Sequence, residues 1–101
     1  TKTDLTGAIV IIDCLTLLVT NLMLTKKKAD GIEREIRLIV SRLKTKKARA
    51  IIVSNEVGLG IVPANRLARD FRDIAGSTNK AVAELADEVI FMVSGIPWKI
   101  K

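Results

Sequence analysis

A run of β-branched residues that stops abruptly at polar residues and glycines places the strongest constraint on how this chain folds. Residues 51–53, Ile-Ile-Val, are followed by Ser-Asn-Glu at 54–56, by Gly-Leu-Gly at 58–60, and then by Pro63 ahead of a charged amphipathic stretch. This order predicts a buried strand, a polar strand end, a glycine turn and a helix. Ligands of open α/β sheets bind just beyond the carboxyl ends of the strands, so the junction is a candidate site.

Two other apolar runs, residues 8–13 and 89–93, also have the composition of buried strands. Apolar residues at helical spacing predict helices over 14–24 and 31–44, with a polar connection at 25–30. A third helix is expected after Pro63, with Gly76 interrupting it before a further helical stretch over 78–86. Alternating strands and helices predict one α/β domain over residues 1–101, with three parallel strands.

The composition narrows the class of protein further. Of the 101 residues, 49% are hydrophobic but only 3% are aromatic, so a single core must be built from Ile, Val, Leu and Ala. The longest apolar stretch, residues 8–24, is interrupted by Asp13 and Asn21, which argues against a membrane span. The single cysteine, Cys14, excludes an internal disulfide, is expected to be a small buried hydrophobe, and fits a reducing, cytoplasmic compartment.

The formal net charge is +6, and the excess of basic residues is clustered. The clusters are Lys26–Lys28, then Lys44, Lys46, Lys47 and Arg49, and finally Lys99 and Lys101. Charge alone would allow a nucleic-acid partner, but no aromatic residues are interleaved with the lysines to stack on bases. We therefore favour solvated surface charge over nucleic-acid binding.

Acidic and amide side chains follow the first two predicted strands. Asp13 ends the first strand, where an acid orients hydrated Mg²⁺ beside phosphates in nucleotide-hydrolysing folds, or caps the next helix. Asn55 and Glu56 end the second strand, where their alternative role is hydrogen bonding within a loop. Two adjacent strands ending in acids would form a shared acidic pocket whose repulsion a metal ion would relieve.

The glycines and arginines of the junction admit two interpretations each. Gly58 and Gly60 would let a nucleotide approach the backbone closely, but a pair of glycines without the third of a dinucleotide fingerprint is more often a turn. Arginines recur every third residue at Arg66, Arg69 and Arg72, and would face phosphates or a neighbouring subunit. The favoured alternative is surface ion pairs four residues apart, Arg66 with Asp70 and Arg69 with Asp73.

The motifs, taken together, resemble one family over nearly the whole chain. They are residues 13–16 with 19–22, the long motif 54–63 (Ser-Asn-Glu-Val-Gly-Leu-Gly-Ile-Val-Pro), residues 65–69 with 71–73, Asn79, and residues 86–89 and 94–96. The chain is similar to the carboxyl-terminal part of the bifunctional adenosylcobinamide kinase/adenosylcobinamide-phosphate guanylyltransferase of cobalamin biosynthesis.

The resemblance implies a P-loop, RecA-like, three-layer α/β fold with a mainly parallel sheet and a homotrimeric assembly. It implies phosphorylation of adenosylcobinamide with GTP or ATP and Mg²⁺, and then transfer of GMP through a guanylylated histidine. The acid at the position of Asp13 contacts the nucleotide in this family.

These 101 residues contain neither a Gly-x-x-x-x-Gly-Lys-Ser/Thr phosphate loop nor any histidine. We therefore expect no catalytic residue in this chain, and an inactive chain when it is alone. The alternative is a non-catalytic assembly or nucleotide-binding module. A sheet that lacks its amino-terminal strands would have an open edge, which predicts an oligomer or an aggregation-prone chain.

Overall fold

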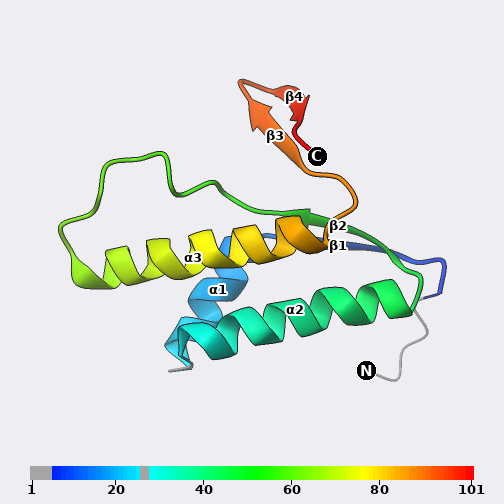
Figure 1. Ribbon diagram of the computed structural model, residues 1–101, viewed down its shortest axis with the longest axis horizontal. Coiled ribbons are helices and arrows are strands. Elements are labelled where there is room, and N and C mark those ends of the chain that lie inside the picture. Colours follow the sequence, from blue (N-terminus) through cyan, green and yellow to red (C-terminus); the bar gives the residue numbers. More distant parts are fainter. Residues whose placement is uncertain (1–5, 26–27) are drawn as a thin grey trace.

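The computed structural model describes residues 6–25 and 28–101, so Lys26 and Lys27 of the first basic cluster lie outside the described residues. The elements in chain order are β1 (Ile9–Asp13), α1 (Leu15–Leu24), α2 (Ala29–Thr45), β2 (Arg49–Val53), α3 (Arg66–Leu85), β3 (Ile90–Val93) and β4 (Ile96–Lys99). Figure 1 shows α2 and α3 running alongside β1 and β2, and the β3–β4 hairpin standing apart from them.

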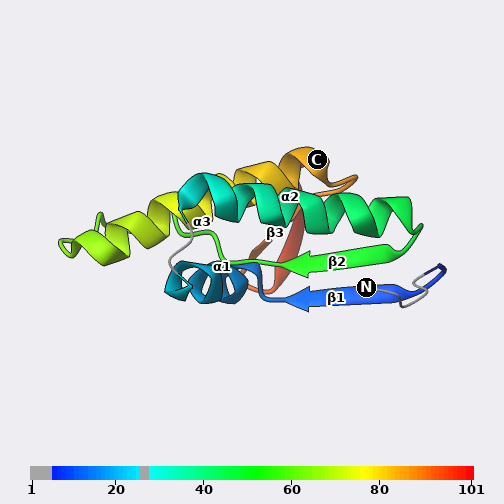
Figure 2. The same cartoon turned by 90° about the horizontal axis from the view of Figure 1, so that it is seen from below.

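Strands β1 and β2 pair in parallel, as the sequence predicts. Ile9 lies opposite Arg49 and Asp13 lies opposite Val53, so the two strands begin and end together. Figure 2 shows the two arrows side by side and pointing the same way, with α1 leading off from the end of β1. The carboxyl ends of both strands therefore form one edge of this small sheet.

The three helices supply the core on one side of the strands. The most deeply buried apolar side chains are Leu15 and Val19 of α1, Ile32 and Ile36 of α2, and Ala75 of α3, with Ile52 of β2 packed against them. In α2 the buried residues recur at the spacing of one helical face, which confirms the predicted stripe. Burial of this face, rather than helix propensity, is the main source of stability for helices of this length.

Helix α3 is a single helix of 20 residues, so the expected interruption at Gly76 was wrong. A glycine in a helix interior costs about 1 kcal/mol relative to alanine. Ala75 and Thr78 on either side of it are both 1% exposed, so tertiary packing outweighs that cost. The helix begins later than Pro63, because the side chain of Asn65 accepts hydrogen bonds from the amides of Leu67 and Ala68.

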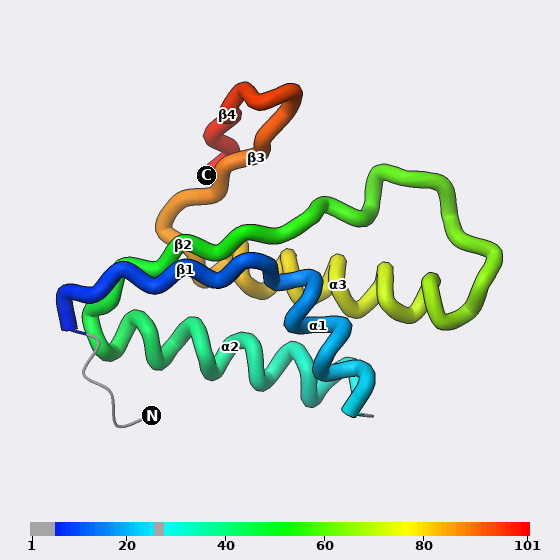
Figure 3. The backbone as a smooth tube through the Cα atoms, turned by 180° about the vertical axis from the view of Figure 1, so that it is seen from behind, coloured from blue at the N-terminus to red at the C-terminus, as the bar shows by residue number. Residues whose placement is uncertain are grey.

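The third predicted strand exists, but its expected parallel pairing was wrong. β3 pairs with β4 in antiparallel fashion, in a two-stranded sheet separate from β1 and β2. Ser94 and Gly95, with φ angles of 51° and 76°, form the tight turn between them. Two consecutive positive φ angles match the twist of a hairpin, so residues 96–99 fold back and pair with β3. Figure 3 shows this hairpin beyond the end of α3.

One face of the β1–β2 pair has no cover among the described residues. Side chains alternate between the two faces of a strand, and those at odd positions face away from the core. Ile11 is 64% exposed and its partner Ile51 is 49% exposed. Parallel sheets are normally covered on both faces, so this face is an open apolar surface. In the part of the chain that the structure describes, no helix is both long and apolar enough to cross a membrane.

Candidate functional site

The carboxyl ends of β1 and β2 bring the predicted site residues to one edge of the sheet. Asp13 closes β1 directly opposite Val53, and Asn55 and Glu56 follow within three residues of the end of β2. The in-register parallel pairing causes this, since it forces both strands to end at the same level. Asp13 does not cap α1, because Cys14 occupies the N-cap position.

The carboxylate of Asp13 is the free acid of this edge. Asp13 is exposed, and no hydrogen bond or ion pair joins its carboxylate to another described residue. Residues 6–25 and 28–101 contain no cluster of three or more His, Cys, Asp or Glu side chains that would hold a metal ion by themselves. A single free carboxylate fits Mg²⁺ that keeps most of its waters and takes its other ligands from phosphates.

Thr16 connects the two strand ends through its hydroxyl group. Asn55 Nδ2 donates to Thr16 Oγ1 at 3.2 Å, and Cys14 Sγ lies 3.2 Å from the same oxygen. The hydrogen bond from Thr16 lowers the pKa of the Cys14 thiol, helped by the Leu17 backbone and opposed by partial burial and the Asp13 charge. Thr16 is 6% exposed, so this contact is fixed by the core beneath it.

Asn79 of α3 holds the chain that leaves β2, and sequence reasoning had given it no role. Its Nδ2 donates to the carbonyl oxygen of Asn55 at 2.9 Å, and its Oδ1 accepts from the hydroxyl of Ser54. An amide side chain can do both because it carries a donor and an acceptor. The available signal was a polar residue at position 79 beside the buried Thr78, on the side of α3 that meets the sheet.

Glu56 is folded back on its own loop. Its Oε1 accepts a hydrogen bond from the amide of Gly58 at 2.7 Å. A Cβ atom at Gly58 would lie 2.9 Å from that oxygen, so a side chain there would push the carboxylate away. Gly60 has open space around it, and no contact among the described residues requires a glycine there. Glu56 thus has the loop-bonding geometry that was its alternative role, while Asp13 lies at the edge with its carboxylate unpaired among the described residues.

The arginines of α3 do not form the predicted ion pairs. Within the described residues neither Arg66 with Asp70 nor Arg69 with Asp73 lies within salt-bridge distance, so that interpretation was wrong. Arg69 Nη1 donates instead to the carbonyl oxygens of Pro63 and Ala64, at 3.2 and 2.7 Å.

Arg72 Nη2 likewise donates to the carbonyl oxygen of Gly58 at 2.6 Å. Backbone carbonyls of the preceding loop therefore compete successfully with the nearby carboxylates for these two guanidinium groups.

Comparisons with known proteins agree with the motifs. The profile of the family described as cobinamide kinase/cobinamide phosphate guanyltransferase matches residues 1–100. The bifunctional adenosylcobalamin biosynthesis proteins of Salmonella typhimurium and Escherichia coli are 41% and 40% identical to the chain over 104 and 105 residues. That of Pseudomonas aeruginosa is 42% identical over 97 residues. The matches cover 91–94% of this chain but only 54–58% of each relative, so the chain spans little more than half their length.

Proposed function

Because the chain belongs to the cobinamide kinase/cobinamide phosphate guanyltransferase family, we propose that it is part of an enzyme that makes and then guanylylates adenosylcobinamide phosphate. The first step would phosphorylate adenosylcobinamide with GTP or ATP, and the second would transfer GMP from GTP to the product. The observation that carries the proposal is the shared edge, where Asp13 and the chain after β2 meet at a strand end.

In this proposal Asp13 is the residue that meets the nucleotide. Its free, exposed carboxylate would hold a water of hydrated Mg²⁺ close to the phosphates, which is the role of the acid at this strand end in nucleotide-hydrolysing folds. The metal would neutralise charge on the phosphates. Asn55 and Glu56 would line the same crevice, and Gly58 and Gly60 would form its outer wall. No residue of this chain is assigned to a covalent step.

We further propose that residues 1–101 are one unit of a larger P-loop, RecA-like, three-layer domain. The open apolar face carried by Ile11 and Ile51 supports this, because a parallel strand pair needs cover on both faces. Further strands and helices of the enzyme would supply that cover, and a homotrimer in the cytoplasm is the assembly we propose.

A second candidate function, a non-catalytic assembly or nucleotide-binding module, is favoured by one observation. The sequence contains no phosphate-loop motif and no histidine to accept GMP. Phosphoryl transfer depends largely on positioning and charge neutralisation around the phosphates, so these residues alone would bind more readily than they would catalyse.

A chimeric enzyme tests the proposed function. In the Escherichia coli relative, this chain would replace the matching 105-residue segment, and formation of adenosylcobinamide phosphate and of its guanylylated product would be measured. We expect both activities, and we expect Asp13→Asn to lower kcat/KM for the kinase step by about tenfold or more. Asp87→Asn is the matched control, because Asp87 is an acid with a 95% exposed side chain in the segment that follows α3 rather than at a carboxyl end of β1 or β2.

A folded chimera that lacks both activities would refute the catalytic proposal and favour the module. Equal activity of the Asp13→Asn and Asp87→Asn variants would instead refute the role of Asp13 while leaving the family function intact.

A further inference from the structure

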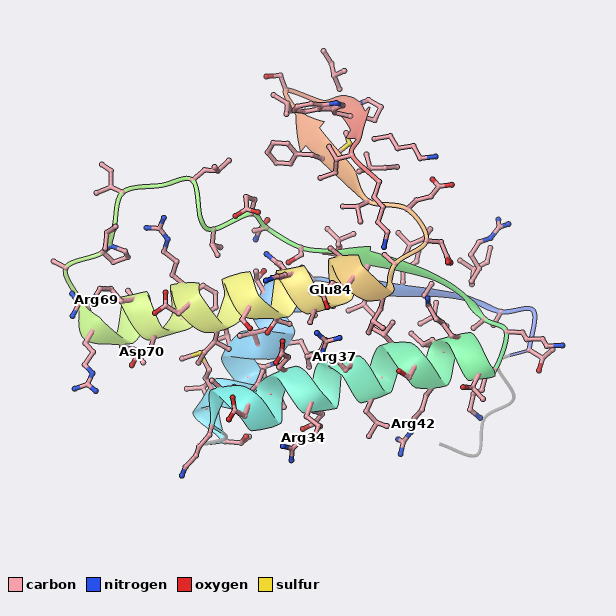
Figure 4. All side chains as sticks on the ribbon, in the orientation of Figure 1. Arg34, Arg37, Arg42, Arg69, Asp70 and Glu84 are labelled. Carbon is pink, nitrogen blue, oxygen red and sulfur yellow. The ribbon has the colours of Figure 1, made fainter. Side chains whose placement is uncertain are left out.

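A hollow of about 480 Å³ lies at the start of α3, and Asp13, Asn55 and Glu56 are not among its lining residues. It is lined by Val62, Arg66, Arg69, Asp70, Arg72 and Asp73. Figure 4 places Arg69 and Asp70 at the first turns of α3, where the chain that leaves β2 comes back to the helix. Its volume falls within the usual range for small-molecule sites, about 300–1,000 Å³.

The wall of the hollow is held by two arginines. Arg69 binds the carbonyl oxygens of Pro63 and Ala64, and Arg72 binds that of Gly58. We call residues 57–65 the arm, and these bonds tie both ends of the arm to one helix. A guanidinium group suits this task because its donors form a rigid, planar fork. The hollow is therefore shaped before any ligand arrives.

The lining also holds polar groups without partners. Arg66, Asp70 and Asp73 make no hydrogen bond or ion pair within the described parts of the chain, although their spacing would allow one pair. Arg72 Nη1 is buried and has no hydrogen-bond partner. Arg66 thus leaves donors, and Asp70 and Asp73 leave acceptors, available in one concavity.

Apolar side chains of the arm accompany these polar groups. Val62 lines the hollow, and its sequence neighbours Leu59 and Ile61 are exposed, Ile61 at 96%. A ligand for this place must therefore combine an apolar body with edge groups that both donate and accept hydrogen bonds. Three arginines and two aspartates mix charges of both signs in the lining, so a neutral group with donors and acceptors matches it better than an anion that can use only the donors.

We propose that the hollow binds the amide-bearing edge of the corrinoid substrate, an inference that rests on the proposed function. A corrin ring is a broad apolar disc whose rim carries primary amides. Amide N–H₂ groups would donate to Asp70 or Asp73, and an amide carbonyl would accept from Arg66. Val62 would lie against the ring, with the exposed Ile61 and Leu59 beside it on the arm. The arm begins directly after Glu56, so it links this hollow to the nucleotide edge.

Direct binding of dicyanocobinamide to the complete 101-residue chain tests the inference without any nucleotide. Equilibrium dialysis would compare the wild type with Asp70→Ala/Asp73→Ala and with the matched control Asp87→Ala/Glu88→Ala. The control removes the same two charges from exposed sites whose pairs, at 3.9 and 4.0 Å, are weak. We expect Kd to rise by about tenfold or more in the first double variant and to be little changed in the control.

A third variant, Arg66→Met, removes a guanidinium group that makes no bond to another described residue, so its effect on binding does not depend on a change in folding. We expect weaker binding here too. Equal Kd values for wild type, both double variants and Arg66→Met would overturn the proposal, and so would a folded wild-type chain that does not bind the probe.

The two proposals fail separately. If the chimera is inactive but the chain binds dicyanocobinamide through Asp70 and Asp73, corrinoid binding in the hollow is supported and the catalytic function is refuted. If the chimera is active and Asp70→Ala/Asp73→Ala leaves its KM for adenosylcobinamide unchanged, the catalytic function is supported and corrinoid binding in the hollow is refuted.

Discussion

Replacement of Asn79 by alanine should loosen the strand-end edge by an amount that the structure allows us to estimate. Asn79 makes two hydrogen bonds there, to the carbonyl oxygen of Asn55 and to the hydroxyl of Ser54. A neutral hydrogen bond contributes about 0.5–1.5 kcal/mol, so their loss costs about 1–3 kcal/mol. Alanine recovers up to about 0.7 kcal/mol as a better helix former. With that full gain subtracted, the free energy of unfolding should fall by about 0.3–2.3 kcal/mol.

Urea unfolding followed by circular dichroism measures this loss, and a double-mutant cycle assigns it. Ser54→Ala, Asn79→Ala and the double variant should give a coupling energy of about 0.5–1.5 kcal/mol. Lys80→Ala is the control for helix propensity, because Lys80 is exposed and makes no bond to another described residue. A coupling energy near zero, or an Asn79→Ala variant as stable as the wild type, would refute the reasoning.

Three other predictions follow from the fold and the edge. Ile36→Ala, at a side chain that is 1% exposed, should lower the free energy of unfolding by about 2–5 kcal/mol, measured in urea, and a smaller loss would show that the core closes around the cavity. Thr16→Val removes the hydrogen bond that lowers the pKa of the Cys14 thiol, so the pH profile of its alkylation by iodoacetamide should move to higher pH; an unchanged profile would contradict this cause. Ile11→Lys places a charge on the open face of the β1–β2 pair and should shift sedimentation toward the monomer, whereas an unchanged distribution would show that this face takes no part in association.

The sequence was sufficient to predict a helix or strand where the spacing of the apolar residues and the length of the run indicated the same type of element. The spacing of Ile32, Ile36 and Val40 predicted the buried face of α2. Continuous β-branched runs likewise predicted β1 and β2, and their parallel order followed from the intervening helices. The shared edge at Asp13 is a consequence of that order.

The errors arose where tertiary contacts or turn chemistry decided the outcome. Gly76 lies in an unbroken helix because its neighbours are buried, which local propensity does not show. The two-residue turn at Ser94-Gly95 reverses the chain, so β3 pairs with the strand that follows it rather than in parallel with β1 or β2. Pro97 is tolerated because β4 pairs with β3 alone among the residues that the structure describes, so its other side is free of ladder hydrogen bonds there.

In the candidate site, the sequence correctly identified which segments meet but not which groups bond. The four-residue spacing predicted ion pairs between arginines and aspartates of α3, but Arg69 and Arg72 donate hydrogen bonds to carbonyl oxygens of the arm instead. Every residue type has a main-chain carbonyl, so the sequence does not indicate which carbonyls accept hydrogen bonds from Arg69 and Arg72. Asn79 was overlooked for the same reason, since one of its two partners is a carbonyl.

Arg69 and Arg72 bind main-chain oxygens of the arm, so the arm and the two arginines should tolerate substitution to different degrees during evolution. Because every residue type has a carbonyl, side chains at the tip of the loop can be exchanged to suit a new ligand without loss of the anchor. The two guanidinium groups have no such freedom, since lysine cannot reproduce their flat, forked geometry. Diversity among relatives should therefore concentrate at positions 59 and 61, opposite a pair of invariant arginines.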